Sequence, residues 1–191
     1  MLKHRVRSDL ASAGEAGTMS ATAIRHTATE LLSLAKGADG LLVTTAGLGP
    51  VAQASQMLGI PIVEADRALA EAAVADGGTV TVLCVAGAAL APARALFERA
   101  AVATGATVEV RLAGGAAALE AEGRKADFLR AIADAADLAF DEGASVVALS
   151  HTSMADAAAL LPGRRLLTAP AAALTAIVRA VQSGPVPAAG P

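Results

Sequence analysis

The residues best suited to chemistry form a turn in which three hydroxyl side chains surround one histidine: Ser150, His151, Thr152 and Ser153. An imidazole gains and loses a proton near neutral pH, so His151 is a candidate general acid or base. The hydroxyls are candidates for binding a substrate carboxylate. A second explanation stays open: Ser150, Thr152 or the end of a helix expected from residue 155 satisfies the ring, and the hydroxyls only cap that helix.

A second hydroxyl-rich turn, with Thr44, Thr45, Ala46 and Gly47, follows a short apolar run at 40–43. Thr45 is too weak an acid to act as a base near pH 7, but its hydroxyl can donate a hydrogen bond to a carboxylate. The small residues can form an anion cradle at the N-terminus of the next helix, and we expect Thr44, Ala46 and Gly47 to contact the ligand there. An ordinary N-cap and turn is the alternative.

The other reactive residues indicate neither a metal nor a nucleotide. The single cysteine, Cys84, lies inside an apolar run at 79–86, and we interpret it as a buried small hydrophobic residue. His4, His26 and His151 are too scattered to indicate a metal site. No glycine-rich phosphate loop containing lysine occurs, and no GxGxxG pattern follows a strand, so no cofactor is expected.

The two turns must be positioned by strands and helices, and the chain alternates between them. Apolar, β-branched runs predict strands at 40–43, 60–66, 79–86, 107–113, 146–149 and 164–170. Small-residue segments bounded by Gly or Pro predict helices at 51–58, 67–75, 90–105, 126–142, from 155, and at 171–181. This alternation implies an α/β fold with parallel sheets covered on both faces. Ligands bind beyond the carboxyl ends of such strands, which here means the loops 44–50, 86–92, 113–117 and 150–154.

The two hydroxyl-rich turns also belong to a weak internal repeat. Aligning residues 38–54 with 144–160 places Thr44 on Ser150 and Thr45 on His151, an offset of 106 residues. Both copies run from an apolar strand through a hydroxyl-rich turn into a helix of small residues. Two similar halves facing each other would place one turn on each side of a cleft.

From about residue 4 to residue 180, the sequence resembles the aspartate/glutamate/hydantoin racemase superfamily. ADGLLVTTAGLGPV and GASVVALSHTSMADAA resemble the two active-site turns of that family, and PIVEADRALAEAAV and TVTVLCVAGAALAPARALFERAA resemble the segments that link them. The resemblance implies two similar three-layer α/β subdomains, at 1–75 plus 171–191 and at 76–170, with the active site in a cleft between them.

The family's racemases work without a cofactor, and two cysteines exchange the proton on opposite faces of the substrate α-carbon. In this sequence Thr45 and His151 stand at those two positions, so the resemblance implies that they are the catalytic residues. The family also begins with a further strand, and from the resemblance we expect the first subdomain of this chain to lack it. We therefore expect an isomerase or a lyase/decarboxylase that acts on a small amino acid or carboxylate, and the alternative is a non-catalytic relative that binds such a carboxylate.

The composition of the chain bears on its partners. With a net charge of −3, no Trp or Tyr and three Phe, the chain offers no basic patch with interleaved aromatic residues, so a nucleic-acid partner is not expected. No apolar run reaches the ~20 residues that a membrane span needs. One cysteine suits a reducing cytoplasm. The family often forms dimers, so a homodimer is a further expectation.

Overall fold

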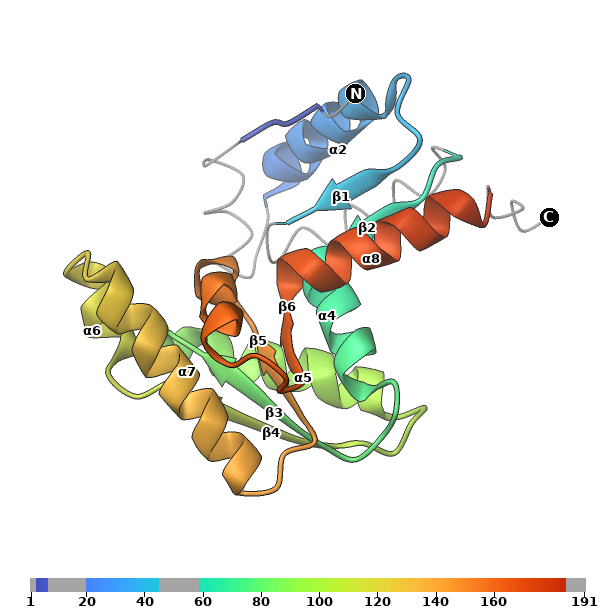
Figure 1. The fold of residues 1–191 in the computed structure, drawn as a ribbon. Helices are drawn as coiled ribbons and strands as arrows, with labels where there is room; N and C mark the ends of the chain where they lie inside the picture. Colours follow the sequence, from blue (N-terminus) through green and yellow to red (C-terminus); the bar gives the residue numbers. More distant parts are fainter. Residues whose placement is uncertain (1–2, 7–19, 45–58, 185–191) are drawn as a thin grey trace. The chain divides into compact units, whose positions relative to one another are not determined.

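A computed structural model of the 191-residue chain describes residues 3–6, 20–44 and 59–184 (Figure 1). The chain divides into two compact units, Met1–Asp66 with Ala173–Pro191, and Arg67–Ala172. The first division lies within the helix α4 (Ala65–Val74) and the second within the helix α8 (Ala169–Gln182). Two helices therefore connect the units, and each unit has its own parallel sheet.

The first unit pairs strands β1 (Leu41–Val43) and β2 (Ile62–Glu64) in parallel and contains the helix α2 (Ala21–Ala35). Ser20 begins α2 by accepting a hydrogen bond from the N–H of Ala23, as an N-cap serine does. Gly40 precedes β1 and allows α8 to pack closely, since a Cβ there would lie 2.8 Å from Cδ1 of Ile177. In the described part of this unit, three buried apolar side chains form one core cluster: Leu31, Leu41 and Val43.

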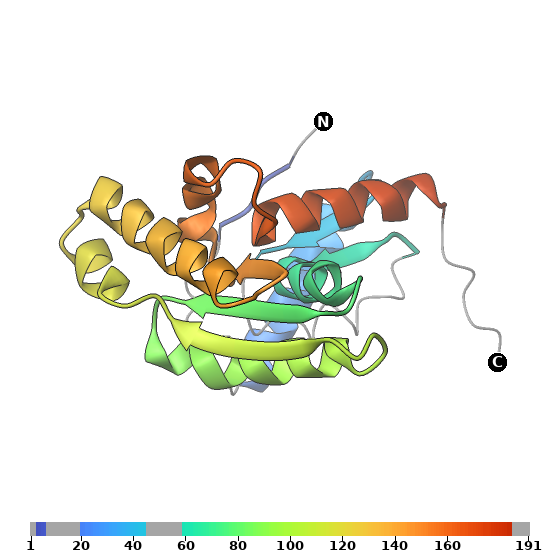
Figure 2. The ribbon, with the colours of Figure 1, turned by 60° about the horizontal axis from the view of Figure 1, so that its bottom comes forward.

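The second unit holds a sheet of four parallel strands in the order β4-β3-β5-β6. In chain order its elements are β3 (Thr79–Cys84), the short 3-10 helix η2 (Gly87–Ala89), α5 (Leu90–Ala101), β4 (Thr107–Leu112), α6 (Ala116–Ala121), α7 (Lys125–Asp141), β5 (Val146–Leu149), the 3-10 helix η3 (Thr152–Leu160) and β6 (Leu166–Thr168). Helices α5 and α7 cover opposite faces of this sheet (Figure 2). The expected parallel α/β architecture is confirmed.

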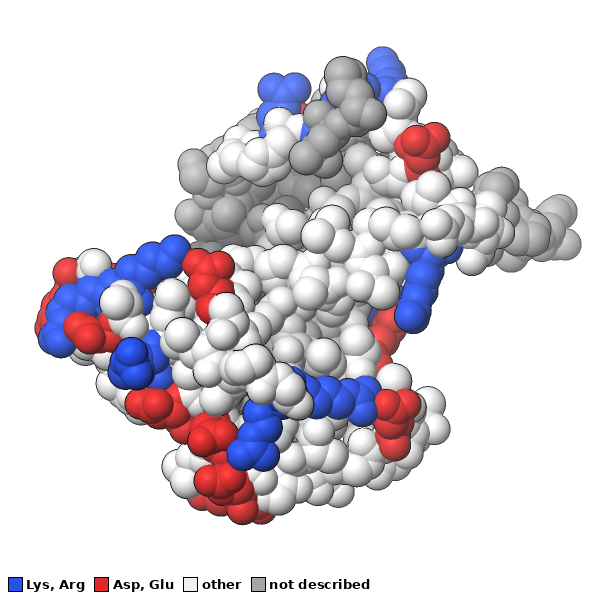
Figure 3. Space-filling view, viewed as in Figure 1, with Lys and Arg blue, Asp and Glu red and all other residues white. Residues whose placement is uncertain are grey.

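Burial explains why these segments fold as they do. Every residue of β5 is buried, as expected for a parallel strand covered on both faces. The apolar side of α7, represented by Phe128 and Ile132, packs onto Val147 and Leu149 of β5. Burial of each such side chain contributes about 1.5–3 kcal/mol. Figure 3 shows acidic and basic side chains mixed within the same groups, with wide uncharged areas of the described surface between the groups.

Some expected elements differ from those in the structure. The helix expected from residue 155 is the 3-10 helix η3, which begins at Thr152. A 3-10 helix repeats every three residues, and this repeat brings Met154 and Ala157 into the core beside α7. The loop expected at 113–117 gives way to α6 at Ala116, and α2 lies where no helix was predicted. The helix predicted at 51–58 lies outside the described residues. None of the described helices is long and apolar enough to cross a membrane.

Candidate functional site

The candidate site lies in the second unit, where the direction of the chain connections reverses. From β3 the chain goes to β4 on one side, and from β4 it crosses to β5 on the other side of β3. In open α/β sheets the crevice between two such strands, at their carboxyl ends, is where ligands bind. The loops that follow β3 and β5 are therefore the candidate site, and the second of them carries the predicted hydroxyl–histidine turn.

Ser150 joins the ends of these two strands. Its N–H donates to the carbonyl of Leu83 at 3.1 Å, and its Oγ donates to Sγ of Cys84 at 3.3 Å. Burial raises the pKa of the Cys84 thiol above its ordinary value, and the hydrogen bond from Ser150 lowers it by less. The thiol therefore stays protonated at neutral pH, as expected of a buried cysteine that is neither a base nor a nucleophile.

His151 is the N-cap residue of η3, and Ser153 holds its ring. Nδ1 lies 2.8 Å from Oγ of Ser153 and accepts a hydrogen bond from the N–H of the same residue at 3.3 Å. Of the partners left open for the ring, the structure shows the end of the helix rather than Ser150 or Thr152, because the first turn of η3 places Ser153 next to the ring. The imidazole remains exposed, and none of the described residues forms a hydrogen bond with Nε2.

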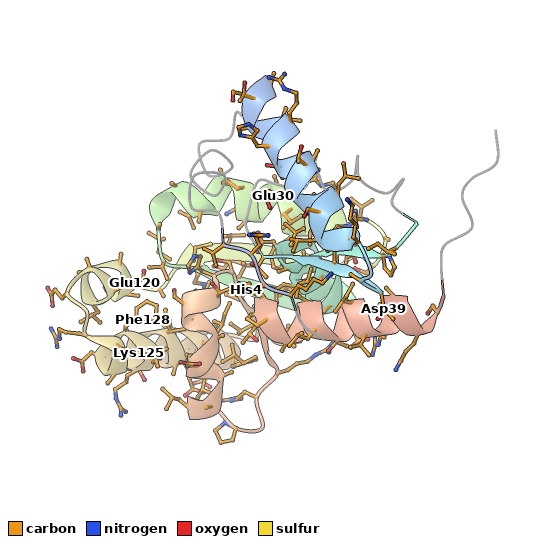
Figure 4. All side chains as sticks on the ribbon, turned by 90° about the horizontal axis from the view of Figure 1, so that it is seen from above. His4, Glu30, Asp39, Glu120, Lys125 and Phe128 are labelled. Atoms are coloured by element: carbon orange, nitrogen blue, oxygen red, sulfur yellow. The ribbon has the colours of Figure 1, made fainter. Side chains whose placement is uncertain are left out.

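An open pocket of about 320 Å³ adjoins this turn. Thr152 and Ser153 form one wall, and the opposite side comes from the end of α6 and the start of α7, where Glu120, Lys125 and Phe128 lie close together (Figure 4). Nζ of Lys125 lies 2.8 Å from Oδ2 of Asp156 at the rim. This hydrogen bond raises the pKa of Lys125, which stays a cation at neutral pH.

Sequence reasoning missed this wall of the pocket. No local pattern links the α6–α7 turn to the turn after β5, and their proximity comes from the packing of η3 on α7. An i,i+3 or i,i+4 charge pair is visible in a sequence, but the pair of Lys125 and Asp156 joins residues on different elements.

The structure brings together four of the predicted site residues: Ser150, His151, Thr152 and Ser153. Thr44 is exposed and follows β1 in the first unit. Thr45, Ala46 and Gly47 lie outside the described residues, so their roles stay predictions. No three His, Cys, Asp or Glu side chains in the described ranges are grouped so that they could hold a metal ion.

Comparisons with known proteins bear on the fold. No protein-family model and no curated protein matches the chain. Among solved structures, an allantoin racemase from Pseudomonas fluorescens is similar, with 18% identity, a TM-score of 0.60, and coverage of 92% of this chain and 85% of that one. A glutamate racemase from Bacillus anthracis has 13% identity and a TM-score of 0.55, and the match covers 87% of this chain and 67% of that one. The chain therefore has the parallel α/β fold of these racemase structures.

Proposed function

We propose that this protein is a cofactor-independent, racemase-like enzyme that moves a proton at the α-carbon of a small amino acid or carboxylate, with His151 as its acid–base residue. The observation that carries the proposal is the 2.8 Å contact between Nδ1 of His151 and Oγ of Ser153. It orients an exposed imidazole at the carboxyl edge of the sheet and leaves Nε2 for a substrate. The fold shared with two racemases supports the same class of chemistry.

The Ser153 hydroxyl suits both directions of a proton transfer. When Oγ accepts a hydrogen bond from Nδ1–H, the lone pair of Nε2 acts as a base and takes the α-proton. The imidazolium that forms keeps its Nδ1–H bonded to Oγ and returns the proton from Nε2, so one residue can remove a proton and return it.

One base reaches only one face of an α-carbon. Isomerisation, decarboxylation or carbon–carbon lyase chemistry therefore fits His151 better than racemisation by two bases. Removal of the α-proton develops negative charge on the adjacent carboxylate, and hydroxyl donors such as Thr152 would stabilise it. Thr44, Thr45, Ala46 and Gly47 stay proposed as substrate-contacting residues of the first unit.

The test is exchange of the α-proton in D₂O, followed by proton NMR over a panel of amino and hydroxy acids. The wild-type protein should exchange at least one member of the panel, and His151→Gln, which keeps a hydrogen-bond donor but no base, should not. Absence of exchange by the wild-type protein across the panel would contradict proton transfer on those substrates.

A non-catalytic carboxylate-binding protein is the second candidate, and one contact favours it. The N–H of Ser153 donates to Nδ1 at 3.3 Å, which keeps the proton of the neutral ring on Nε2 and makes His151 a donor. Such a protein would gain thermal stability with a small carboxylate, because ligand that binds only the folded state stabilises it. It would show that shift without any exchange of the α-proton.

A further inference from the structure

β4 is an edge strand of the four-stranded sheet, and no strand in the described ranges pairs with its outer side. The N–H groups of Thr107 and Ala113 donate towards β3, to Gly78 at 2.8 Å and to Cys84 at 2.9 Å. Backbone groups alternate in direction along a strand, so the N–H and C=O groups of residues 108, 110 and 112 point outward. They form a row that can accept another strand.

The side chains of β4 alternate between charged and apolar. Glu109 and Arg111 lie on one face, with a 2.8 Å contact between a carboxylate oxygen and Nη2. Arg111 also pairs with Glu142 at the end of α7. On the other face Val110 is buried, Val108 is half-buried and Leu112 is 45% exposed. An acid, Glu109, therefore precedes Val110 along the strand, and a base, Arg111, follows it.

We propose that β4 pairs with β4 of a second copy of this chain, antiparallel about a two-fold axis at Val110. In this register Glu109 lies opposite the second copy's Arg111, and Arg111 opposite the second copy's Glu109. Val108 lies opposite the second copy's Leu112, so apolar side chains also meet. The three outward residues of each strand all become hydrogen-bonded pairs, which gives about six bonds between the copies. A two-fold axis closes the assembly at two chains.

Charge selects this register over its neighbours. A shift of the axis to residue 109 places Glu109 opposite itself, and a shift to residue 111 places Arg111 opposite itself. Like charges directly opposite each other on antiparallel strands are destabilising, whereas opposite charges are favourable. The pairing displaces one contact, from Nη2 of Arg94 to the outward carbonyl of Val110, which at 3.5 Å is long for a hydrogen bond.

The experiment measures mass in solution by sedimentation equilibrium, over a range of protein concentrations. The wild-type chain should dimerise. Glu109→Arg and Arg111→Glu should each raise the dissociation constant at least roughly tenfold, because like charges then meet at both symmetric positions. An equimolar mixture of these two variants should associate, since every acid then faces a base. The variant that carries both substitutions should dimerise alone.

Asp134→Arg is the matched control, because Asp134 is an exposed acid on α7 rather than on β4. It should dimerise like the wild type. Circular dichroism of each variant checks that the fold is kept, which matters for Arg111→Glu because it also loses the pair with Glu142. A monomeric wild-type chain, a Glu109→Arg variant as dimeric as the wild type, or a mixture of folded variants that stays monomeric would each overturn the proposal.

Discussion

Met154→Ala tests whether the core beneath α7 holds the histidine turn in place. Met154 is fully buried and lies in one core cluster with Phe128 and Ile132 of α7, three residues after His151. A buried Met replaced by Ala loses about 2–5 kcal/mol from the free energy of unfolding, through lost transfer energy and the cavity left behind. For a chain of this length each kcal/mol lowers the melting temperature by about 2–4 °C, so a fall of roughly 4–20 °C is expected.

Urea unfolding followed by far-UV circular dichroism is the appropriate assay, because the chain has no Trp or Tyr to report by fluorescence. Met154→Leu conserves volume and should cost less than about 1.5 kcal/mol. Leu160→Ala is the matched control: Leu160 lies on the same 3-10 helix but is 48% exposed, so its loss should be close to 0.5 kcal/mol. Equal losses for Met154→Ala and Leu160→Ala would refute the packing of η3 on α7.

Two further predictions concern the sheet of the second unit. Because burial raises the pKa of Cys84 above its ordinary value of 9.0, the unfolded chain releases this proton first, so the free energy of unfolding falls as the pH rises above about 9. Cys84→Ala should flatten that fall in urea titrations between about pH 8 and 10, and an unchanged slope would contradict the burial of the thiol. Gly78 has a positive φ of 79°, and a Cβ added there would lie 2.7 Å from Oγ of Ser145. Gly123 has a similar φ of 70°, but a Cβ added there would meet no atom within 4 Å. Gly123→Ala should cost about 1–2 kcal/mol, and Gly78→Ala should cost more; equal costs would show that Ser145 moves aside freely.

The strands of the second unit could be predicted well from the sequence, because buried parallel strands are short runs made almost entirely of β-branched and other apolar residues. β3 and β5 fall within the expected ranges 79–86 and 146–149. Helix α7, expected at 126–142, spans Lys125–Asp141. Apolar residues of α7 recur with the helical period, so the position of this helix could be predicted without knowing the fold.

Features that depend on packing could not be predicted in the same way. A 3-10 helix and an α-helix share much of their sequence pattern, so η3 was expected as an ordinary helix from residue 155. Helix α6 is only six residues long and follows two glycines, which indicate a loop. The contact of Ser150 with Cys84 and the ion pair of Lys125 with Asp156 depend on the strand order and on the packing of η3 on α7.

The candidate site was predicted in part. The sequence pattern placed His151 after a strand at the carboxyl edge of the sheet, and the structure confirms this position. Which group would hold the ring depended on the geometry of the first turn of η3, and the partner is Ser153. The racemase-type fold that the residues of the two turns suggested is the fold of the chain.

The most direct test of the central claim is the rate of α-proton exchange by wild-type protein, His151→Gln and Ser153→Ala on one substrate. Positioned acid–base groups contribute about 10²–10⁴-fold, so His151→Gln should slow exchange at least ~100-fold, while a carboxylate still raises the melting temperature. Ser153→Ala keeps the N–H that favours a proton on Nε2 and loses the hydroxyl, so it should exchange more slowly than the wild type. A His151→Gln variant that exchanges the α-proton as fast as the wild type would contradict the role of His151.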